Sequence, residues 1–243
     1  MPTQERDIAN KKLDIYILMG QSNMAGRGPL IFEDSMIQNS DVLMFSKDLK
    51  WVAAKNPIHF DKPSVAAVGP GLSFGLAMQA AYKSKTIALV PTAVGGTSIN
   101  FWTPGGFDKN TKKYPWDDAE KRIIEAMKYG TVKGVIWHQG ESDSNAESAE
   151  VYLPKLVDLI KRVRTLVGNE NLPFIVGQLG RYNPKYDNIN KQTVKLPALV
   201  THTAIVSSEG LVDKGDNTHF DRASAIILGE RFAEKMLEVQ KNK

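Results

Sequence analysis

The feature that most constrains the fold of this chain is a series of short, almost uninterrupted apolar runs. They predict five strands, at Asp14–Met19, Thr86–Val90, Gly134–Trp137, Pro173–Gln178 and Thr203–Val206. Strands that are apolar on both faces are typical of a parallel sheet that helices cover on both sides. The runs therefore predict an α/β protein with a mostly parallel central sheet.

Segments with helical periodicity separate or follow these runs. They predict four helices, at Leu72–Lys83, Asp117–Tyr129, Ala146–Val167 and Arg222–Val239. Pro154 falls near the start of the third helix, where a proline is tolerated or bends the helix. The alternation of strands and helices favours βαβ units in a doubly wound sheet. Lys47–Pro70 and Asn100–Trp116 are expected to be long loops, which are often functional in a compact domain.

Length and composition fit one ordinary globular domain. The chain has 243 residues, of which 42% are hydrophobic and 24% charged, as is typical of globular proteins. We expect one domain, residues 1–243, with its core at about residues 13–239, because a chain of this size buries roughly 70–75% of its surface. The absence of cysteine excludes disulfides, thiolate metal sites and cysteine nucleophiles.

The charge pattern argues against two classes of partner. The formal net charge is +4, and the densest basic run, Lys109–Lys113, is short and mixed with polar residues. A nucleic-acid partner is not expected, because it would need a basic stripe with stacking aromatics. No segment reaches the ~18–20 apolar residues of a membrane span, and no signal peptide is recognisable. We therefore expect no membrane partner, and a protein that is cytoplasmic or was secreted with its leader removed. The sequence leaves the oligomeric state open.

Polar segments follow the predicted strands. They are Gly20–Gly26, Pro91–Ile99, His138–Asp143, Leu179–Arg181 and Ser207–Leu211, and four of the five are rich in glycine, hydroxyl, amide or ionisable residues. In an open α/β sheet, ligands bind beyond the carboxyl ends of the strands. The functional site is therefore expected where these segments meet.

Ser22 follows the first strand across a tight turn, which would expose its hydroxyl at the edge of the sheet. The GxSxG pattern is absent, since Met24 stands at its second glycine, and a helix cap is the alternative interpretation of Ser22. Asp216 precedes His219 by three residues. Its carboxylate can then accept the Nδ1–H of the imidazole and orient Nε2 toward a nucleophile, although His219 can also be a loop residue that caps the last helix.

Two further segments carry groups that could act in catalysis. Gly95 and Gly96 can bring backbone amides close to a developing oxyanion, or form a plain turn. The segment His138–Asp143 has three interpretations. They are an oxyanion or orienting loop, a polar turn, and a metal site made by His138, Glu141, Asp143 and His219.

Taken in order, these motifs resemble the sialate O-acetylesterase / acetylxylan esterase group, which is carbohydrate esterase family 6 of the SGNH (GDSL-like) hydrolases. The resemblance spans residues ~13–235 and depends on Gly20–Gly28, Gly95–Ile99 with Trp102, His138–Asp143 and Asp216–Asp221. The first and third motifs are long and specific, and the others stand in the expected order. The resemblance implies a flavodoxin-like, three-layer α/β/α sandwich that hydrolyses O-acetyl esters of carbohydrates without a metal or other cofactor.

The resemblance also implies roles for individual residues. Ser22 would be the nucleophile and His219 the general base. Asp216 would be the primary partner of His219, with Glu141 as a second, competing carboxylate. The oxyanion hole would consist of the amides of Ser22 and Gly95 and the side chain of Gln139, where most SGNH hydrolases have an asparagine.

Three residues at the border of this site are assigned to substrate binding: Gln21, Arg27 and Trp102. Trp102 can stack on a sugar ring or take a packing role. Arg27 can contact an anionic substrate or pair with Asp143 or Glu141.

The leading hypothesis is a serine esterase that removes O-acetyl groups through an acetyl-enzyme, with an acetylated carbohydrate as its partner. One alternative is a metal-dependent hydrolase, although the ligand spacing matches no recognised zinc motif. A second is a non-catalytic carbohydrate-binding domain, which is disfavoured because Ser22, Asp216 and His219 are all present. A third is a GDSL-type lipase or thioesterase, for which no long apolar acyl tunnel is evident. The sugar itself, xylan, sialic acid or another glycan, stays open.

Overall fold

One seven-stranded sheet forms the centre of the computed structural model, which describes residues 12–37 and 39–241. The strand order is β3-β2-β4-β1-β5-β6-β7, and within the described residues only β3 runs antiparallel, to β2. The mostly parallel sheet predicted from the apolar runs is confirmed. The strands are β1 (Leu13–Gly20), β2 (Val42–Phe45), β3 (Trp51–Ala53), β4 (Ile87–Pro91), β5 (Gly130–His138), β6 (Phe174–Gly177) and β7 (Thr203–Val206).

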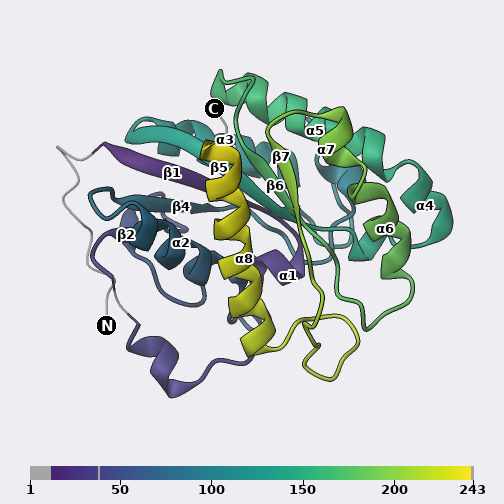
Figure 1. Ribbon diagram of the computed structural model, residues 1–243, viewed down its shortest axis with the longest axis horizontal. Coiled ribbons are helices and arrows are strands. Elements are labelled where there is room, and N and C mark those ends of the chain that lie inside the picture. Colours follow the sequence, from purple (N-terminus) through teal and green to yellow (C-terminus); the bar gives the residue numbers. More distant parts are fainter. Residues whose placement is uncertain (1–11, 38, 242–243) are drawn as a thin grey trace.

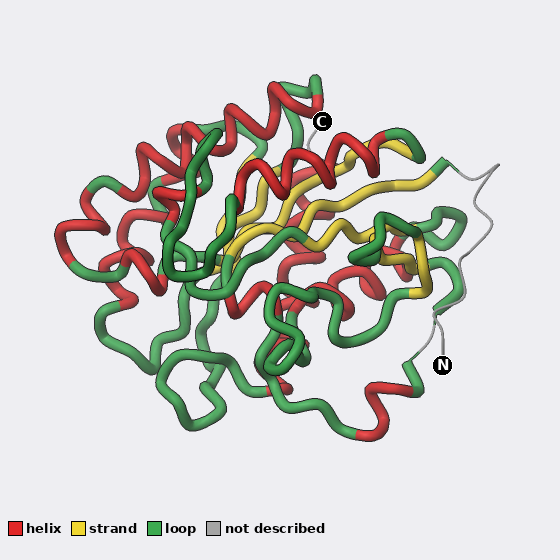
Figure 2. Tube along the Cα trace, turned by 180° about the vertical axis from the view of Figure 1, so that it is seen from behind, coloured by secondary structure: helices red, strands yellow, loops and turns green. Residues whose placement is uncertain are grey.

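Helices cover both faces of the sheet, which gives three layers (Figures 1 and 2). Along β1, Ile15 and Ile17 pack in one core with α3 and α5, whereas Tyr16 and Leu18 pack in a second core with α2 and α8. The α/β/α sandwich is therefore confirmed. The helices are α1 (Ser22–Ala25), α2 (Pro70–Ala81), α3 (Pro115–Met127), α4 (Ala146–Glu150), α5 (Tyr152–Val167), α6 (Tyr186–Thr193), α7 (Leu196–Leu199) and α8 (Arg222–Lys241).

The structure differs from the sequence-based expectation in several segments. The helix predicted at Ala146–Val167 is divided at Val151 into α4 and α5, and Pro154 lies in the first turn of α5. The loop expected at Lys47–Pro70 contains β3, so that part of the prediction is wrong. Strand β2 and helices α6 and α7 were not predicted. No helix in the described part of the chain is both long and apolar enough to cross a membrane.

The carboxyl ends of β1, β4 and β5 lie side by side, because β1 pairs with β4 on one edge and with β5 on the other. The last pair of β1 and β5 is Gly20 with His138. Gly20 has a φ of 137°, and a Cβ there would lie 2.0 Å from the carbonyl oxygen of His138. Only glycine allows this close approach, after which the Gln21 amide donates to the same carbonyl at 2.9 Å. The turn after β1 is thereby held against the segment after β5.

Helices α2 and α8 pack closely on one face of the sheet, and α8 begins three residues after His219. Ser73 of α2 donates its hydroxyl to the carbonyl of Ile226 at 2.9 Å. A Cβ at Gly229 of α8 would lie 2.1 Å from Ser73 Oγ and 2.2 Å from the carbonyl oxygen of Pro70. The absence of a side chain at Gly229 therefore sets the separation of the two helices.

Gly229→Ala is expected to lower the free energy of unfolding by about 1–3 kcal/mol, because the added methyl overpacks the interface. In an exposed helix the same change raises the free energy of unfolding by about 1 kcal/mol. The sign of the measured change therefore shows whether Gly229 lies in a tightly packed interface. Urea denaturation measures the difference. Gly75→Ala in α2 is the matched control with a smaller expected loss, since its Cβ meets only the ends of aliphatic side chains. A more stable Gly229→Ala variant would contradict this packing.

Candidate active site

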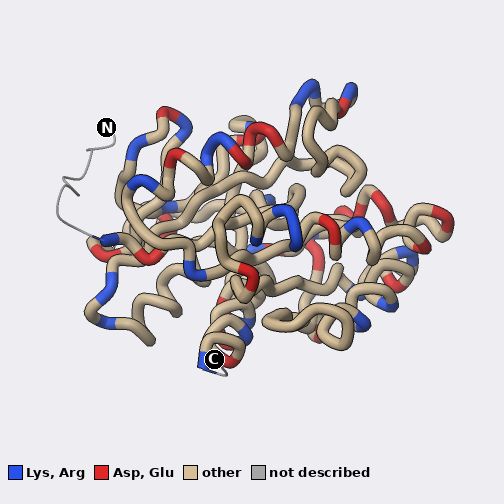
Figure 3. The backbone as a smooth tube through the Cα atoms, turned by 90° about the horizontal axis from the view of Figure 1, so that it is seen from above, with Lys and Arg blue, Asp and Glu red and all other residues tan. Residues whose placement is uncertain are grey.

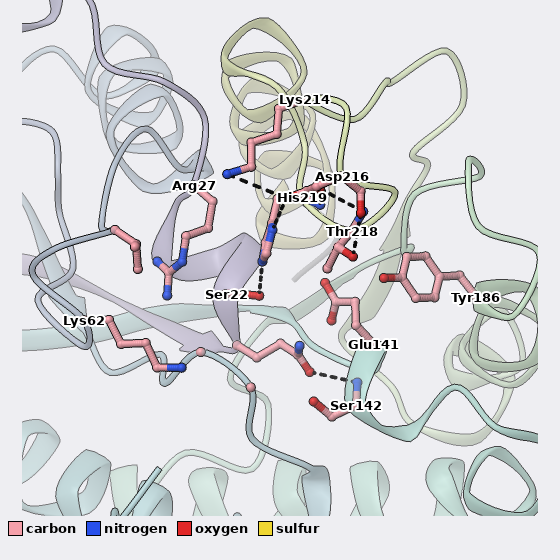
Figure 4. Close-up of a pocket in the computed structure, with 14 residues that line it drawn as sticks. Ser22, Arg27, Lys62, Glu141, Ser142, Tyr186, Lys214, Asp216, Thr218 and His219 are labelled. Carbon is pink, nitrogen blue, oxygen red and sulfur yellow. Dashed lines mark hydrogen bonds and ion pairs between the residues drawn. The ribbon is translucent and has the colours of Figure 1, made fainter. Parts of the chain in front are cut away.

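A cavity of about 540 Å³ opens at the carboxyl edge of the sheet. Its walls come from the segments that follow β1, β4, β5 and β7, which contribute Ser22, Gly95, Glu141 and His219 (Figure 4). Parallel strands bring their carboxyl ends to one edge, and the cavity lies where ligands bind in open α/β sheets. Of the polar segments singled out at the strand ends, those after β1, β4 and β5 therefore meet in space. Ser207–Leu211 does not line the cavity, and the chain after β7 contributes through residues 214–219 instead.

Ser22, His219 and Asp216 form a hydrogen-bonded chain in this cavity (Figure 4). His219 Nε2 lies 3.0 Å from Ser22 Oγ, and His219 Nδ1 lies 2.8 Å from Asp216 Oδ2. Ser22 is the first residue of α1, whose N-cap position is Gln21. Because the Ser22 hydroxyl faces the imidazole, the geometry does not favour the alternative that Ser22 is a helix cap. It is the arrangement that a serine nucleophile and its base require.

The Asp216 carboxylate is held by its own turn. Besides the imidazole, it accepts the amides of His219 at 2.8 Å and Thr218 at 3.0 Å. Burial raises the pKa of Asp216, but the hydrogen bonds from His219 and Thr218 outweigh it and lower the pKa to about 2. An ionised Asp216 keeps the imidazole proton on Nδ1, which leaves Nε2 free to accept the Ser22 hydroxyl proton.

Glu141 also lines the cavity but contacts other groups. Its Oε1 accepts the side-chain amide of Asn23 at 2.6 Å and lies 3.6 Å from His138 Nδ1. The pKa of His138 is lowered, because the effect of burial outweighs the Glu141 charge and the hydrogen bond to the Gln178 carbonyl, which both act to raise it. No hydrogen bond joins Glu141 to His219 within the described residues. Of the two competing carboxylates, Asp216 is therefore the one on His219.

The three groups predicted for the oxyanion hole have different surroundings. The Ser22 amide donates to no acceptor in the described chain, so it is free to bind a ligand. The Gly95 amide donates to Asp61 Oδ2 at 2.8 Å. The Gln139 side chain is 1% exposed and lies behind the cavity wall rather than on it. The roles of these residues stay predictions, but of the three predicted groups only the Ser22 amide is an unoccupied donor at the cavity.

Of the three residues predicted to bind substrate, two line the cavity and one does not. Gln21 and Arg27 line the cavity. Arg27 pairs with Asp61 at 2.7 Å, and both side chains are buried, so the alternative in which Arg27 pairs with Asp143 or Glu141 is wrong. Asp143 instead accepts the Ser98 hydroxyl and the Ile99 amide.

Trp102 lies in the hydrophobic core rather than at the cavity. Its side chain is 1% exposed, and its ring makes an edge contact with Trp137 at 5.1 Å between centroids. Its Nε1 donates to Thr97 Oγ1 at 3.4 Å. The packing role, one of the two interpretations of Trp102, fits this position, and stacking on a sugar does not.

The four side chains of the metal alternative do not converge. His138 Nε2 lies 3.0 Å from the carbonyl of Gln178, Asp143 binds Ser98, and His219 faces Ser22. Across residues 12–37 and 39–241, no group of three or more His, Asp or Glu side chains is arranged to hold a metal ion. Nothing in this geometry favours the metal-dependent mechanism.

Two residues of the site were missed in the sequence. Asn23 donates to Glu141 and to the carbonyl of Thr218, and its Oδ1 accepts the Phe220 amide. Its place beside Ser22 in the first motif was the available signal. Asp61 binds both Arg27 and the Gly95 amide, and no local pattern distinguishes it in its loop. Burial alone would raise the pKa of Asp61, but the hydrogen bond and the charge of Arg27 outweigh burial, so the pKa of Asp61 is lowered.

Charges of both signs surround the cavity. Lys62 and Lys214 stand at its border with Arg27, against Glu141 and Asp216. Lys214 Nζ lies 3.6 Å from Asp216 Oδ2, whereas Lys62 has no ion-pair partner in the described chain. Over the whole backbone, basic and acidic residues are interspersed (Figure 3). The local balance suits a polar substrate.

A three-layer α/β/α sandwich with a Ser–His–Asp chain at the carboxyl edge of its sheet is an arrangement found in hydrolases, the SGNH type among them. Residues 12–238 match the family described as carbohydrate esterase, sialic acid-specific acetylesterase. The chain belongs to this family of carbohydrate esterases, and it is a carboxylic ester hydrolase of the carbohydrate acetylesterase type.

Known proteins agree with this assignment. A probable carbohydrate esterase of Arabidopsis thaliana is 33% identical over 92% of this chain and 90% of its own length. The X-ray structure from that Arabidopsis locus has a TM-score of 0.83 at 32% identity, covering 93% of this chain and 98% of the other. A carbohydrate acetylesterase from Xanthomonas citri (TM-score 0.70, 20% identity, 95% and 57% covered) and NanS (0.73, 15%, 96% and 99%) share the fold.

Asp216→Asn is expected to lower kcat for p-nitrophenyl acetate by up to about 10⁴-fold, because an amide no longer holds the required imidazole tautomer. Glu141→Gln is the matched control, with a much smaller loss expected, since no hydrogen bond or ion pair joins Glu141 to His219 in the described chain. Steady-state kinetics of both variants at neutral pH provides the comparison. A larger loss in Glu141→Gln would make Glu141 the primary carboxylate.

Proposed function

We propose that the chain is a serine esterase that removes O-acetyl groups from carbohydrates through an acetyl-enzyme on Ser22. The observation that carries the proposal is the chain from Ser22 Oγ to His219 Nε2, at 3.0 Å, and from His219 Nδ1 to Asp216, at 2.8 Å. Membership of the carbohydrate esterase family supports the substrate class.

In the first half-reaction, Ser22 Oγ attacks the acetyl carbonyl carbon while His219 Nε2 takes the hydroxyl proton. The π electrons of the carbonyl move to its oxygen, which becomes the oxyanion. As the tetrahedral intermediate collapses, the bond to the sugar oxygen breaks and His219 returns the proton to that oxygen. Asp216 stabilises the imidazolium that forms in between.

In the second half-reaction, water replaces the sugar. His219 removes a proton from the water, whose oxygen attacks the acetyl-enzyme carbonyl. The new intermediate collapses to acetic acid and free Ser22, with the proton passing from His219 to Oγ. The cavity is open to solvent beside His219, whose side chain is 22% exposed, so water reaches the base directly.

The walls of the cavity suit a short acyl group on a polar alcohol. Among its lining residues only Val65 is aliphatic, and the others carry hydroxyl, amide, imidazole or charged groups or are glycines. No apolar tunnel for a long acyl chain leads away from Ser22 among the described residues, which weighs against a lipase or thioesterase. The family description favours acetylated sialic acid, and acetylated xylan is the second candidate substrate.

Ser22→Ala is expected to lower kcat for p-nitrophenyl acetate by about 10⁶-fold, because the acetyl-enzyme can no longer form. A fluorophosphonate should modify the wild-type chain once, at Ser22, as intact-mass and peptide mass spectrometry would show. Full esterase activity in Ser22→Ala would refute the serine mechanism. Activity that is lost on chelation and restored by Zn²⁺ would favour a metal-dependent hydrolase instead.

Acetyl esters should be hydrolysed far faster than octanoyl esters of the same alcohol, because Val65 is the single aliphatic side chain among the lining residues that could hold the longer chain. The measurement is kcat/KM for p-nitrophenyl acetate and octanoate. Acetate release from acetylated sialic acid, acetylated xylan and simple acetylated sugars then ranks the natural alcohol. A preference for octanoate would contradict the proposed acyl group.

A further inference from the structure

The side chain of Gln21 is buried but presents one polar atom to the cavity. Gln21 is 3% exposed, yet it lines the cavity beside Ser22. Its Oε1 faces the protein and accepts Gln139 Nε2 at 3.0 Å and the Ser142 amide at 3.3 Å, the second bond being drawn in Figure 4. Because all these partners are N–H donors, they fix which end of the amide is oxygen.

The Gln21 Nε2 group therefore points away from these donors. In the described chain it donates to no acceptor, and it is not among the buried polar atoms shut off from solvent. A side-chain amide that is held through its oxygen and has an open N–H at a cavity is a preorganised donor.

The amide of Gln139 has the opposite arrangement. Its Nε2 carries two hydrogens and is surrounded by three acceptors, Gln21 Oε1, the Thr97 carbonyl at 3.0 Å and Asp143 Oδ2 at 2.6 Å. Its backbone carbonyl accepts the Tyr152 hydroxyl at 2.8 Å. Both Gln139 N–H groups are thus consumed inside the wall, and neither is left for a substrate oxygen.

We infer that Gln21 Nε2, not Gln139 Nε2, is the side-chain donor of the oxyanion hole, acting with the Ser22 amide. This inference rests on the proposed serine mechanism. Gln139 is then a positioning residue, which holds the oxygen end of Gln21 so that the nitrogen end faces the cavity. The two donors belong to consecutive residues, so the turn that presents the nucleophile also presents the charge-stabilising groups.

The attack of Ser22 on the ester requires a hydrogen-bond donor beside the carbonyl oxygen. When Ser22 Oγ bonds to the acetyl carbon, the carbonyl electron pair moves to oxygen and negative charge develops there. A fixed N–H beside that oxygen gains strength as the charge grows, whereas it adds little for the neutral ester. The Gly95 amide is meanwhile directed at the Asp61 carboxylate, which leaves a second strong donor to be supplied by Gln21.

Two variants of Gln21 test the inference. Gln21→Met removes both ends of the amide, and Gln21→Glu keeps an acceptor for Gln139 and Ser142 but removes the donor. Both should lower kcat for p-nitrophenyl acetate by about 10²–10³-fold, the usual cost of one oxyanion donor, with KM changed less than about threefold. Binding of a trifluoromethyl ketone, which forms a tetrahedral oxyanion on Ser22, should weaken by the same factor as kcat/KM.

A purely structural role predicts a different pattern. In that case Gln21→Glu would restore the hydrogen bonds of the wall, keep kcat within about threefold of wild type and bind the ketone normally. That result would overturn the inference. Urea denaturation of each variant confirms that the compared proteins are folded.

Gln139→Met separates the two glutamines in a double-mutant cycle. Alone it should lower kcat, because Gln21 loses its anchor. In the Gln21→Met background it should cause no further loss, since the donor that it positions is already gone. A further loss of about tenfold or more in that background would make Gln139 a direct donor and overturn the assignment.

Labelling of Ser22 and the activity of Ser22→Ala distinguish a failure of the Gln21 assignment from a failure of the proposed serine mechanism. If a fluorophosphonate does not modify Ser22 in the wild-type chain, the serine mechanism itself fails. If Ser22 is modified and Ser22→Ala is inactive, but both Gln21 variants keep full kcat, only the assignment of Gln21 fails.

Discussion

Three loops that follow different strands meet on one buried side chain, and the geometry of the site depends on that junction. Asn23 donates to Glu141 in the segment after β5 and to the Thr218 carbonyl in the segment after β7, and it accepts the Phe220 amide. Both N–H groups and one acceptor position of its amide are used, and an unpaired group there would cost the full desolvation penalty. Because Asn23 follows Ser22 directly, the same contacts that satisfy it set the position of His219 relative to Ser22.

Much of this architecture could be predicted from the sequence because most strands are continuous apolar runs. The five predicted strands correspond to β1, β4, β5, β6 and β7, which are buried and long enough to form continuous apolar runs. Their carboxyl ends necessarily meet at one edge, so the polar segments behind them converge without any knowledge of the loops. Strand β3 has three residues and β2 has four. Strand β2 is as long as β6 and β7 and is fully buried and apolar, so its sequence did carry a strand signal. The three residues of β3 are too few for a periodicity to develop.

The finer features of the site were beyond local sequence for a physical reason. Gln21 and Gln139 carry chemically identical side chains, and which nitrogen faces the cavity depends on partners that range from Asp143, 4 positions from Gln139, to the contact between the two glutamines across 118 positions. Arg27 pairs with Asp61 because the loop that follows β3 carries that carboxylate into the wall, while Asp143 is occupied by Ser98. Whether a polar group is available to a ligand depends on which hydrogen bonds it already makes. Those hydrogen bonds exist only in the folded chain.

Ser22 and His219, the proposed nucleophile and base, stand 197 positions apart, which has a consequence for how the site is assembled. Ser22 leaves the ribosome before His219, together with the turn that positions it. His219 lies between β7, at the edge of the sheet, and α8, which has to dock against α2 before the loop is held. A growing chain therefore carries Ser22 without its imidazole partner until α8 has emerged.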